Sequence, residues 1–571
     1  MRTLMQAALA ALAVMASASG AAAAPSASET PTTLWHGGTI ITMDGPTPRT
    51  VEAVVERGGK IVFAGAERRA RVLAGAGAKV EELGGATMLP GFVDAHSHFA
   101  LVLQAAGGID MADPALFATR TIPGQLAALK AEATRRDLVG PGKWLIAWQY
   151  NDETLAERRH ITRAELDALF PDQPVVLLHF TMHGLVANSA ALAAAGVDET
   201  TRNPEGGVMP KGPDGKLTGL LFEQAMMLMA AKLPQPTVEQ KLAALDEAQL
   251  RYAREGYTHA QEGATQLPDL KFLLSDAART RLVLDLAVLP FYSTLDWVLG
   301  QDTLQFGTYQ GHLKLEGIKF VLDGSPQART AYSTREYARG APDGHHPWHG
   351  EPSLNAERFH AMAAKVHAKG WQLFVHANGD AAIDMAITEF DRLGITAKDN
   401  RRPIVIHSQF QRPDQLPAYA RIGVGPAYFS NHTYYFADTH RSNFPAEVVD
   451  FISPFNAARA AGLVVSNHSD APVTALDTMT QLWSAMARTS ITGIVSGADQ
   501  RLSAYAALQA MTTGPAWQVF EENRKGRIKA GLLADFVVLD HNPLTTPVDQ
   551  IRAIKVLRTI KEGRTIWAGR R

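Results

Sequence analysis

The sequence contains no cysteine among its 571 residues, and this absence excludes several kinds of chemistry at once. Disulfide bonds, thiolate zinc sites and cysteine nucleophiles are all removed. Any bound metal ion must therefore be held by histidine, by carboxylates or by a modified lysine. An excess of one charge is also missing, because the formal net charge is -2. This balance gives no indication of nucleic acid or of an anionic membrane surface as a partner.

The apolar run near the start of the chain is too short and too rich in alanine for a good membrane span. Met1–Ala24 has the pattern of a secretory signal peptide, with Arg2 as its positive start, Leu4–Met15 as its apolar segment and three alanines before Pro25 as its cleavage site. We expect a periplasmic or secreted protein with no stable membrane association once the signal is removed. A weak N-terminal anchor is the alternative.

Short strands rich in valine, isoleucine and threonine are predicted at both ends of the mature chain. They cover Leu34–Met43, Ala53–Gly65, Lys79–Leu89, Asp535–Asp540, Ile554–Arg558 and Arg564–Ala568. Because the two ends share this pattern, we predict that residues 33–89 and 523–571 together form one small β-sandwich domain.

Between these ends, strand-like runs alternate with alanine-rich helical patterns, which predicts parallel strands in an α/β fold. The clearest strands are Val175–His179, Leu282–Leu289, Leu315–Leu322, Gln372–His376, Pro403–His407 and Leu463–Asn467, and the clearest helices are Leu242–Glu255, Asn355–Lys369 and Ala381–Leu393. Over residues 90–522 a (β/α)8 TIM-like barrel is the favoured architecture, with a doubly wound sheet as the alternative. Residues 101–233 are more than one crossover helix requires, so we predict an inserted lobe that covers the mouth of the barrel.

The stretch Leu89–His98 carries the first indication of chemistry. A Pro-Gly break and the apolar pair Phe92-Val93 lead into a His-x-His formed by His96 and His98. Residues two apart in a strand lie on the same face, so both imidazoles can share one metal ion. Neutral imidazole is the commonest metal ligand in proteins. Two surface histidines near a turn are the alternative interpretation.

Further metal-type residues lie in or directly after later predicted strands. They are Lys319 inside an apolar strand, His376 and His407 at strand ends, and Asp470 shortly after the last strand. In a barrel, chemistry takes place at the carboxyl ends of the strands, so these residues are predicted to meet at one rim. His468, two residues before Asp470, is predicted to hydrogen-bond to a metal-binding residue without binding the metal itself.

The order His-x-His, Lys, His, His, Asp resembles the amidohydrolase superfamily. The finer resemblance is to amidohydrolase family 3, the branch that includes the N-substituted formamide deformylase-like proteins. It covers about Leu34 to Trp567 and rests on the motifs Pro90–His98, Asn188–Leu192, Lys319 with Asp323–Ser325, Arg329–Ala331, His376–Asp380, His407–Gln409, His432–Tyr435, Ser469–Val473 and Gly531–Phe536.

This resemblance implies a site for two divalent metal ions, with zinc as the favoured metal. It implies that His96, His98 and Asp470 hold the more buried ion and that His376 and His407 hold the second. Lys319 would bridge both ions after carboxylation by carbon dioxide, because a plain ammonium group has no lone pair to offer a cation. Manganese, iron and nickel stay open as alternatives. A lysine whose ammonium group reaches solvent at the strand edge is the other interpretation of Lys319.

The same resemblance implies a metal-dependent hydrolase that cleaves a non-peptide C-N amide-type bond of a small N-formyl or N-acyl amine. Asp470 would accept the proton of the attacking water and pass it to the leaving amine. Among the remaining residues, His183, Arg329 and His432 are candidate substrate-binding residues, with a surface loop as the alternative for His183 and an ion pair as the alternative for Arg329. An ester, lactone or cyclic-amide hydrolase is one alternative, and a non-catalytic regulatory or binding protein with the same fold is another. The sequence leaves the oligomeric state open, a homo-oligomer included.

Overall fold

The computed structural model describes residues 31–112, 116–140, 142–180, 184–204, 207–230, 232–234, 236–342 and 344–569. The predicted signal peptide, Met1–Ala24, lies outside the described residues. Among those that are described, no helix is both long and apolar enough to cross a membrane.

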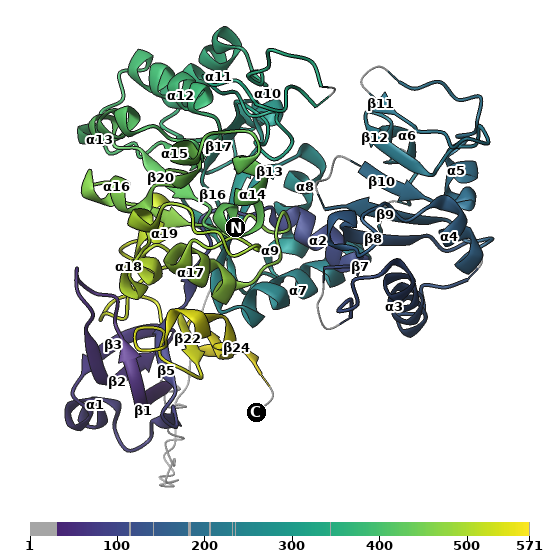
Figure 1. The fold of residues 1–571 in the computed structure, drawn as a ribbon. Helices are drawn as coiled ribbons and strands as arrows, with labels where there is room; N and C mark the ends of the chain where they lie inside the picture. The colour runs from purple at the N-terminus through teal and green to yellow at the C-terminus, as the bar shows by residue number, and fades with distance from the viewer. Residues whose placement is uncertain are drawn as a thin grey trace, which may run out of the picture.

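Parallel strands form the centre of the molecule (Figure 1). One group consists of β6 (Phe92–Val93), β13 (Tyr257–Thr265), β14 (Asp285–Pro290) and β16 (Leu313–Leu315), which pair in this order. The other consists of β17 (Gly317–Val321), β18 (Gln372–Ala377), β19 (Ile404–His407), β20 (Gly425–Tyr428) and β21 (Ser466–Asn467), again paired in chain order.

The two groups join at both sides. β16 and β17 are separated only by Glu316, whose N–H donates to the carbonyl of Val288 in β14 at 3.1 Å, so they act as one strand that pairs with both groups. At the other side the N–H of Asp470 donates to the carbonyl of His96 at 3.1 Å, which connects the segment after β21 to the segment after β6. With β16 and β17 taken as one, these described strands number eight and follow one another in the order of the parallel barrel that the sequence predicted.

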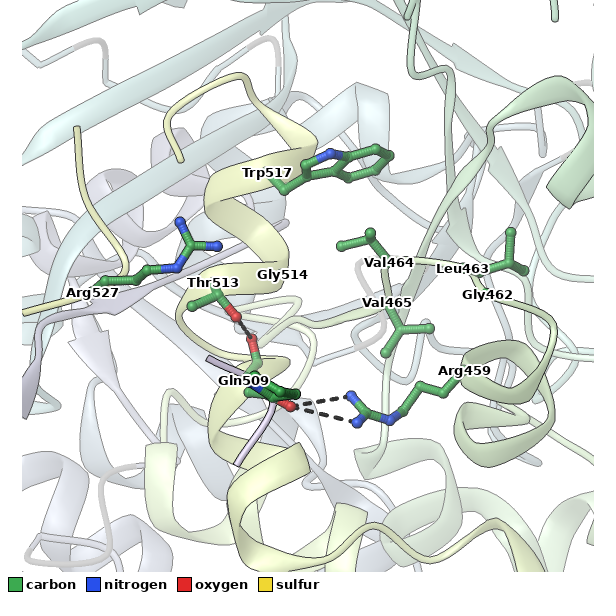
Figure 2. A pocket seen from close by; sticks show the side chains of 11 residues that line it. Arg459, Gly462, Leu463, Val464, Val465, Gln509, Thr513, Gly514, Trp517 and Arg527 are labelled. Carbon is green, nitrogen blue, oxygen red and sulfur yellow. Dashed lines mark hydrogen bonds between the residues drawn. The ribbon is translucent and has the colours of Figure 1, made fainter. Parts of the chain in front are cut away.

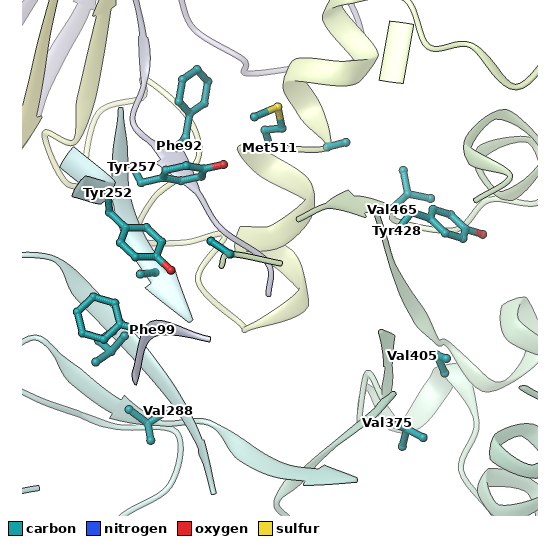
Figure 3. Packing of buried hydrophobic residues seen from close by; sticks show 14 of the residues in the cluster. Phe92, Phe99, Tyr252, Tyr257, Val288, Val375, Val405, Tyr428, Val465 and Met511 are labelled. Carbon is teal, nitrogen blue, oxygen red and sulfur yellow. The ribbon is translucent and has the colours of Figure 1, made fainter. Parts of the chain in front are cut away.

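Helices pack against the outside of the barrel strands and bury their hydrophobic side chains there. α7 (Val238–Arg254), α11 (Ala356–Ala368) and α12 (Asp380–Arg392) confirm the three predicted helices. α7 begins at a capping box formed by Thr237 and Gln240. It buries Tyr252 near Tyr257 of β13, with ring centroids 5.9 Å apart (Figure 3).

One predicted strand is shorter than expected. The sequence predicted a strand over Leu463–Asn467, but β21 covers only Ser466–Asn467. The partner strand β20 explains the difference. The N–H of Gly425 donates toward β19, so the next N–H along β20 should face β21, and that position is Pro426, which has no N–H.

Strands from both chain ends form a single eight-stranded sheet, which confirms a β domain built from the two termini (Figure 1). The N-terminal strands are β1 (Thr32–Ile41), β2 (Thr50–Arg57), β3 (Lys60–Gly65), β4 (Lys79–Glu82) and β5 (Thr87–Pro90), and the C-terminal strands are β22 (Phe536–Leu539), β23 (Val556–Lys561) and β24 (Arg564–Ala568). Where β5 meets β22, Met88 and Val538 face the core of this domain, whereas Leu89 and Val537 pack against the barrel. The alternation of side chains along a strand thus attaches the β domain to the barrel.

The segment between α2 (Phe99–Gly107) and α7 forms a lobe with its own sheet (Figure 1). Its strands are β7 (Ile109–Asp110), β8 (Leu145–Tyr150), β9 (Val175–His179), β10 (Gly184–Ala187), β11 (Gly207–Val208) and β12 (Leu220–Glu223), and its longer helices are α3 (Ile122–Arg135), α4 (Arg163–Leu169) and α5 (Ser189–Ala195). In β9, Val175 and Leu177 belong to one hydrophobic cluster and Val176 and Leu178 to another, so both faces of the sheet are covered.

Candidate metal centre

The barrel places the predicted metal-type residues at the carboxyl ends of its strands. His96 and His98 follow β6, His407 ends β19, and Asp470 lies three residues after β21. Parallel strands end at the same rim, so residues far apart in the sequence meet there. Ligand atoms of His96, His407 and Asp470 all lie within 4.8 Å of one another.

The carboxylate of Asp470 lies beside both histidines of the His-x-His. Its Oδ1 is 3.7 Å from Nε2 of His96 and 3.5 Å from Nε2 of His98. This buried oxygen has no hydrogen-bond partner among the described residues. A buried carboxylate oxygen without a partner is costly, and a cation is the natural group to satisfy it. Two imidazoles and a carboxylate are a donor set that suits zinc and similar divalent metals.

Lys319 reaches the same point from β17. Its neighbours Ile318 and Phe320 belong to the main hydrophobic core, so Lys319 faces the opposite side of the strand. Its Nζ lies 3.2 Å from Nε2 of His96, and the side chain is 1% exposed. A lysine that extends to solvent is therefore ruled out. Burial lowers the pKa of Lys319 to about 7, so much of this amine is uncharged at neutral pH.

His376 stands next to His407, at the edge of the cluster. The two ring centroids are 4.6 Å apart. Nε2 of His376 is 3.4 Å from Oδ1 of Asp323, 3.3 Å from the carbonyl of Gly324 and 3.1 Å from the amide nitrogen of Asn378. Nδ1 is then the nitrogen that His376 has left to offer a metal.

The protonation states favour metal binding. Burial together with the nearby Lys319 holds the pKa of His96 well below its usual range, and burial does the same for His407. Both imidazoles are therefore neutral and keep a lone pair. Burial by itself would raise the pKa of Asp470, but His407 and His98 hold it well below its usual range. Asp470 is a carboxylate at neutral pH.

Two ligand candidates have a strained backbone. His407 has φ of 70° and Asp470 has φ of 52°, both in the left-handed region that residues other than glycine seldom adopt. Such strain costs about 1–3 kcal/mol per residue and collects at functional sites. The fold therefore holds these two side chains in place at the expense of stability.

Two polar residues that support the candidate ligands or their loops were not predicted from the sequence. Oε1 of Gln261 in β13 lies 2.9 Å from Nδ1 of His96. Asp94 accepts the N–H of Ser469 at 3.0 Å and so connects the His-x-His loop to the Asp470 loop. Asp94 lies two residues before the His-x-His and could have been proposed, whereas a single glutamine inside a strand carries no recognisable pattern.

Of the three candidate substrate-binding residues, the structure places one, His432, close to the metal-type histidines. His183 lies outside the described residues. Arg329 donates to the backbone carbonyls of Gly340 and Ala341 at 3.0 and 3.1 Å, so its guanidinium holds a loop. His432 is buried in a π-helical turn, His432–Phe436, with its ring centroid 5.8 Å from that of His407. Its Nδ1 has no hydrogen-bond partner in the described part of the chain. Their role in substrate binding stays a prediction.

Two cavities lie close to the barrel but are not lined by the histidines. A cavity of about 1270 Å³ separates the lobe from α2 and α7, and Ala471 and Pro472, next to Asp470, form part of its wall. A smaller pocket of about 370 Å³ lies at the amino-terminal end of β21, between Arg459, Trp517 and Arg527 (Figure 2). The amino-terminal end of a barrel strand is remote from the rim where chemistry takes place.

A known protein family, several known proteins and solved structures resemble this chain over most of its length. A model of the amidohydrolase family matches residues 79–567. The candidate amidohydrolase YtcJ of Bacillus subtilis (strain 168) is 28% identical over 558 residues, which cover 94% of this chain and 99% of that protein. N-substituted formamide deformylase of Arthrobacter pascens is 25% identical over 523 residues, covering 90% of this chain and 94% of that protein. A solved metal-dependent hydrolase from Pyrococcus horikoshii OT3 matches with a TM-score of 0.72 at 22% identity, covering 91% of this chain and 99% of that one, and shows the same fold.

Proposed function

The chain belongs to the amidohydrolase family, and from this premise we propose that it is an exported hydrolase that cleaves the C-N bond of a small N-formyl or N-acyl amine. The observation that carries the proposal is the Asp470 carboxylate. It is buried, ionised at neutral pH and next to both histidines of the His-x-His, and one of its oxygens lacks a partner among the described residues.

The residues suit a centre for divalent metal ions. His96, His98 and Asp470 would hold one ion, and His376 and His407 a second. Divalent ions lower the pKa of water and polarise carbonyl groups, which is the chemistry that amide hydrolysis requires. Zinc is the metal we favour, because imidazoles and carboxylates suit it.

The side chain of Lys319 supports its proposed role as a carboxylated bridge between two ions. Carbon dioxide reacts with an uncharged amine and releases a proton, and burial lowers the pKa of Lys319 to about 7, so about half of this amine is uncharged at pH 7. The product, a carbamate, is an anion whose oxygens can serve as ligands. Its negative charge would face the neutral imidazole of His96, 3.2 Å from Nζ.

Proton transfer is the part that Asp470 performs in this proposal. An ionised carboxylate can accept a proton from the attacking water and give it to the leaving nitrogen. The same transfer would serve an ester, but an amide needs it more because an amine must be protonated before it leaves. The name of the formamide deformylase relative supports the N-formyl class.

A substrate screen tests the proposal. Purified protein of known metal content is incubated with matched pairs of N-formyl amines, N-acetyl amines, esters and lactones, and the release of amine or alcohol is measured. We expect turnover of N-formyl or N-acyl amines, and loss of that turnover after chelation. Turnover of esters or lactones alone would overturn the C-N assignment, and bound metal without any turnover would favour a binding protein.

Export and assembly are also part of the proposal. The pattern of Met1–Ala24 supports cleavage and a periplasmic or secreted mature protein. Fractionation of cells that express the full chain tests this. Recovery of an uncleaved, membrane-bound protein would contradict it. A homo-oligomer is compatible with the proposal, and light scattering of the mature protein measures it.

A further inference from the structure

One buried imidazole contacts the proposed metal centre without belonging to it. Nε2 of His468 lies 3.2 Å from Nδ1 of His407, and both side chains are buried. His468 is held from two sides. Its backbone N–H donates to the carbonyl of Tyr428 at 3.0 Å, and its ring stacks on Phe429 with centroids 5.1 Å apart and planes 15° from parallel.

The chemistry of imidazole decides the direction of this contact. A neutral imidazole has one N–H and one lone pair, so one ring must donate and the other must accept. If His468 donated, the hydrogen of His407 would sit on Nε2, and His407 could offer no lone pair to a metal ion. We infer that His468 is a positioning residue for His407: it accepts the hydrogen on Nδ1 of His407, which fixes the tautomer in which Nε2 is free to bind metal.

The other nitrogen of His468 indicates that the contact with His407, and not packing, requires a histidine here. Its Nδ1 is buried and has no hydrogen-bond partner among the described residues. A phenyl ring at this position could stack on Phe429 without burying an unsatisfied polar atom. Packing alone therefore gives no reason for a histidine here, whereas the contact with His407 does.

His96 shows the same arrangement with a different partner. Its Nδ1 faces Oε1 of Gln261 at 2.9 Å, and an amide oxygen can only accept. An amide is therefore an adequate partner for a ligand histidine in this centre. Glutamine also reaches about as far as Nε2 of a histidine, so it is the replacement that should preserve the function of His468.

The test compares His468→Phe with His468→Gln and rests on the metal centre proposed above. Metal is removed from each protein, and the affinity for Zn²⁺ is measured by competition with a chromogenic chelator. We expect His468→Phe to bind the more weakly held zinc ion about 10–100-fold less tightly, as is typical when the partner of a ligand histidine is removed, and His468→Gln to recover most of that loss.

Several outcomes would overturn the inference. Wild-type affinity in a folded His468→Phe protein would do so, and so would equal losses in the phenylalanine and glutamine variants. If the phenylalanine variant fails to fold, His468→Asn replaces it, because asparagine is too short to reach His407. The inference then requires weaker zinc binding with Asn than with Gln, and equal affinities contradict it. Absence of zinc binding by the wild-type protein would instead defeat the proposed metal centre.

Discussion

Replacing Lys319 with methionine should make the metal-free protein more stable and also inactive. Burial lowers the pKa of Lys319 from the ordinary value of 10.5 to about 7. At pH 7 the lysine is charged in the unfolded chain, so folding must remove much of that charge or bury it. From the two pKa values this costs about 4 kcal/mol, at 1.36 kcal/mol for each pKa unit. Methionine has a similar length and no charge, so it avoids the cost.

The dependence on pH has a definite sign. Because the folded pKa lies below the unfolded one, the unfolded chain binds the extra proton between about pH 7 and pH 10.5, and wild-type stability rises with pH across this window. The advantage of Lys319→Met should therefore be largest at or below pH 7 and should shrink as the pH approaches 10.5. Urea denaturation of chelator-treated proteins at pH 7 and pH 9 measures this difference.

Lys314→Met is a matched control, because the same substitution should have the opposite effect. Lys314 is also buried, but its Nζ lies 2.6 Å from a carboxylate oxygen of Glu316 and 2.7 Å from one of Glu521. Removing one partner from a buried ion pair typically costs about 3–5 kcal/mol. A loss of stability in Lys319→Met like that of the control, or a gain that does not change with pH, would refute the reasoning.

Three further predictions concern the centre itself. Asp470→Asn should keep the fold but lower kcat by about 10²–10⁴-fold in assays with saturating zinc, since the amide cannot take a proton; an unchanged kcat would exclude proton transfer by Asp470. Gln261→Leu should weaken zinc binding about 10–100-fold, because Nδ1 of His96 loses its acceptor; unchanged affinity by chelator competition would contradict this. Activation of metal-free protein by zinc at fixed dissolved carbon dioxide should quicken about tenfold per pH unit up to about pH 7 and then level off; a rate still rising steeply at pH 9 would mean an ordinary lysine.

Most of the barrel, and the meeting of the candidate metal ligands at one rim, could be predicted because each signal is local. A short apolar run followed by a histidine, as in Ile404–His407, contains both the strand and its functional end. Parallel strands then bring such ends together without any further information. Lys319 was recognisable because it stands inside an apolar strand and completes the order His-x-His, Lys, His, His, Asp, whereas Lys314, also between two core residues, forms a buried ion pair.

The remaining features depend on contacts between distant segments. Gln261 and His96 are 165 residues apart, and the glutamine becomes significant only when β13 lies beside β6. The pairing of β5 with β22 joins the two chain ends. The sequence of each strand shows which of its side chains alternate between the two faces, but it does not show which strand is its partner. The short length of β21 has a cause that the sequence contains, because Pro426 can be read there. Its effect on β21 could not be predicted without knowing that β20 and β21 pair.

The most direct test of the account is a crystal structure of the purified mature protein with diffraction data collected at the absorption edge of the bound metal. The account predicts a strong anomalous peak within coordination distance of His96, His98 and Asp470, and a second beside His376 and His407. A metal-replete crystal with no anomalous peak among these residues would contradict the claim that they converge to bind metal.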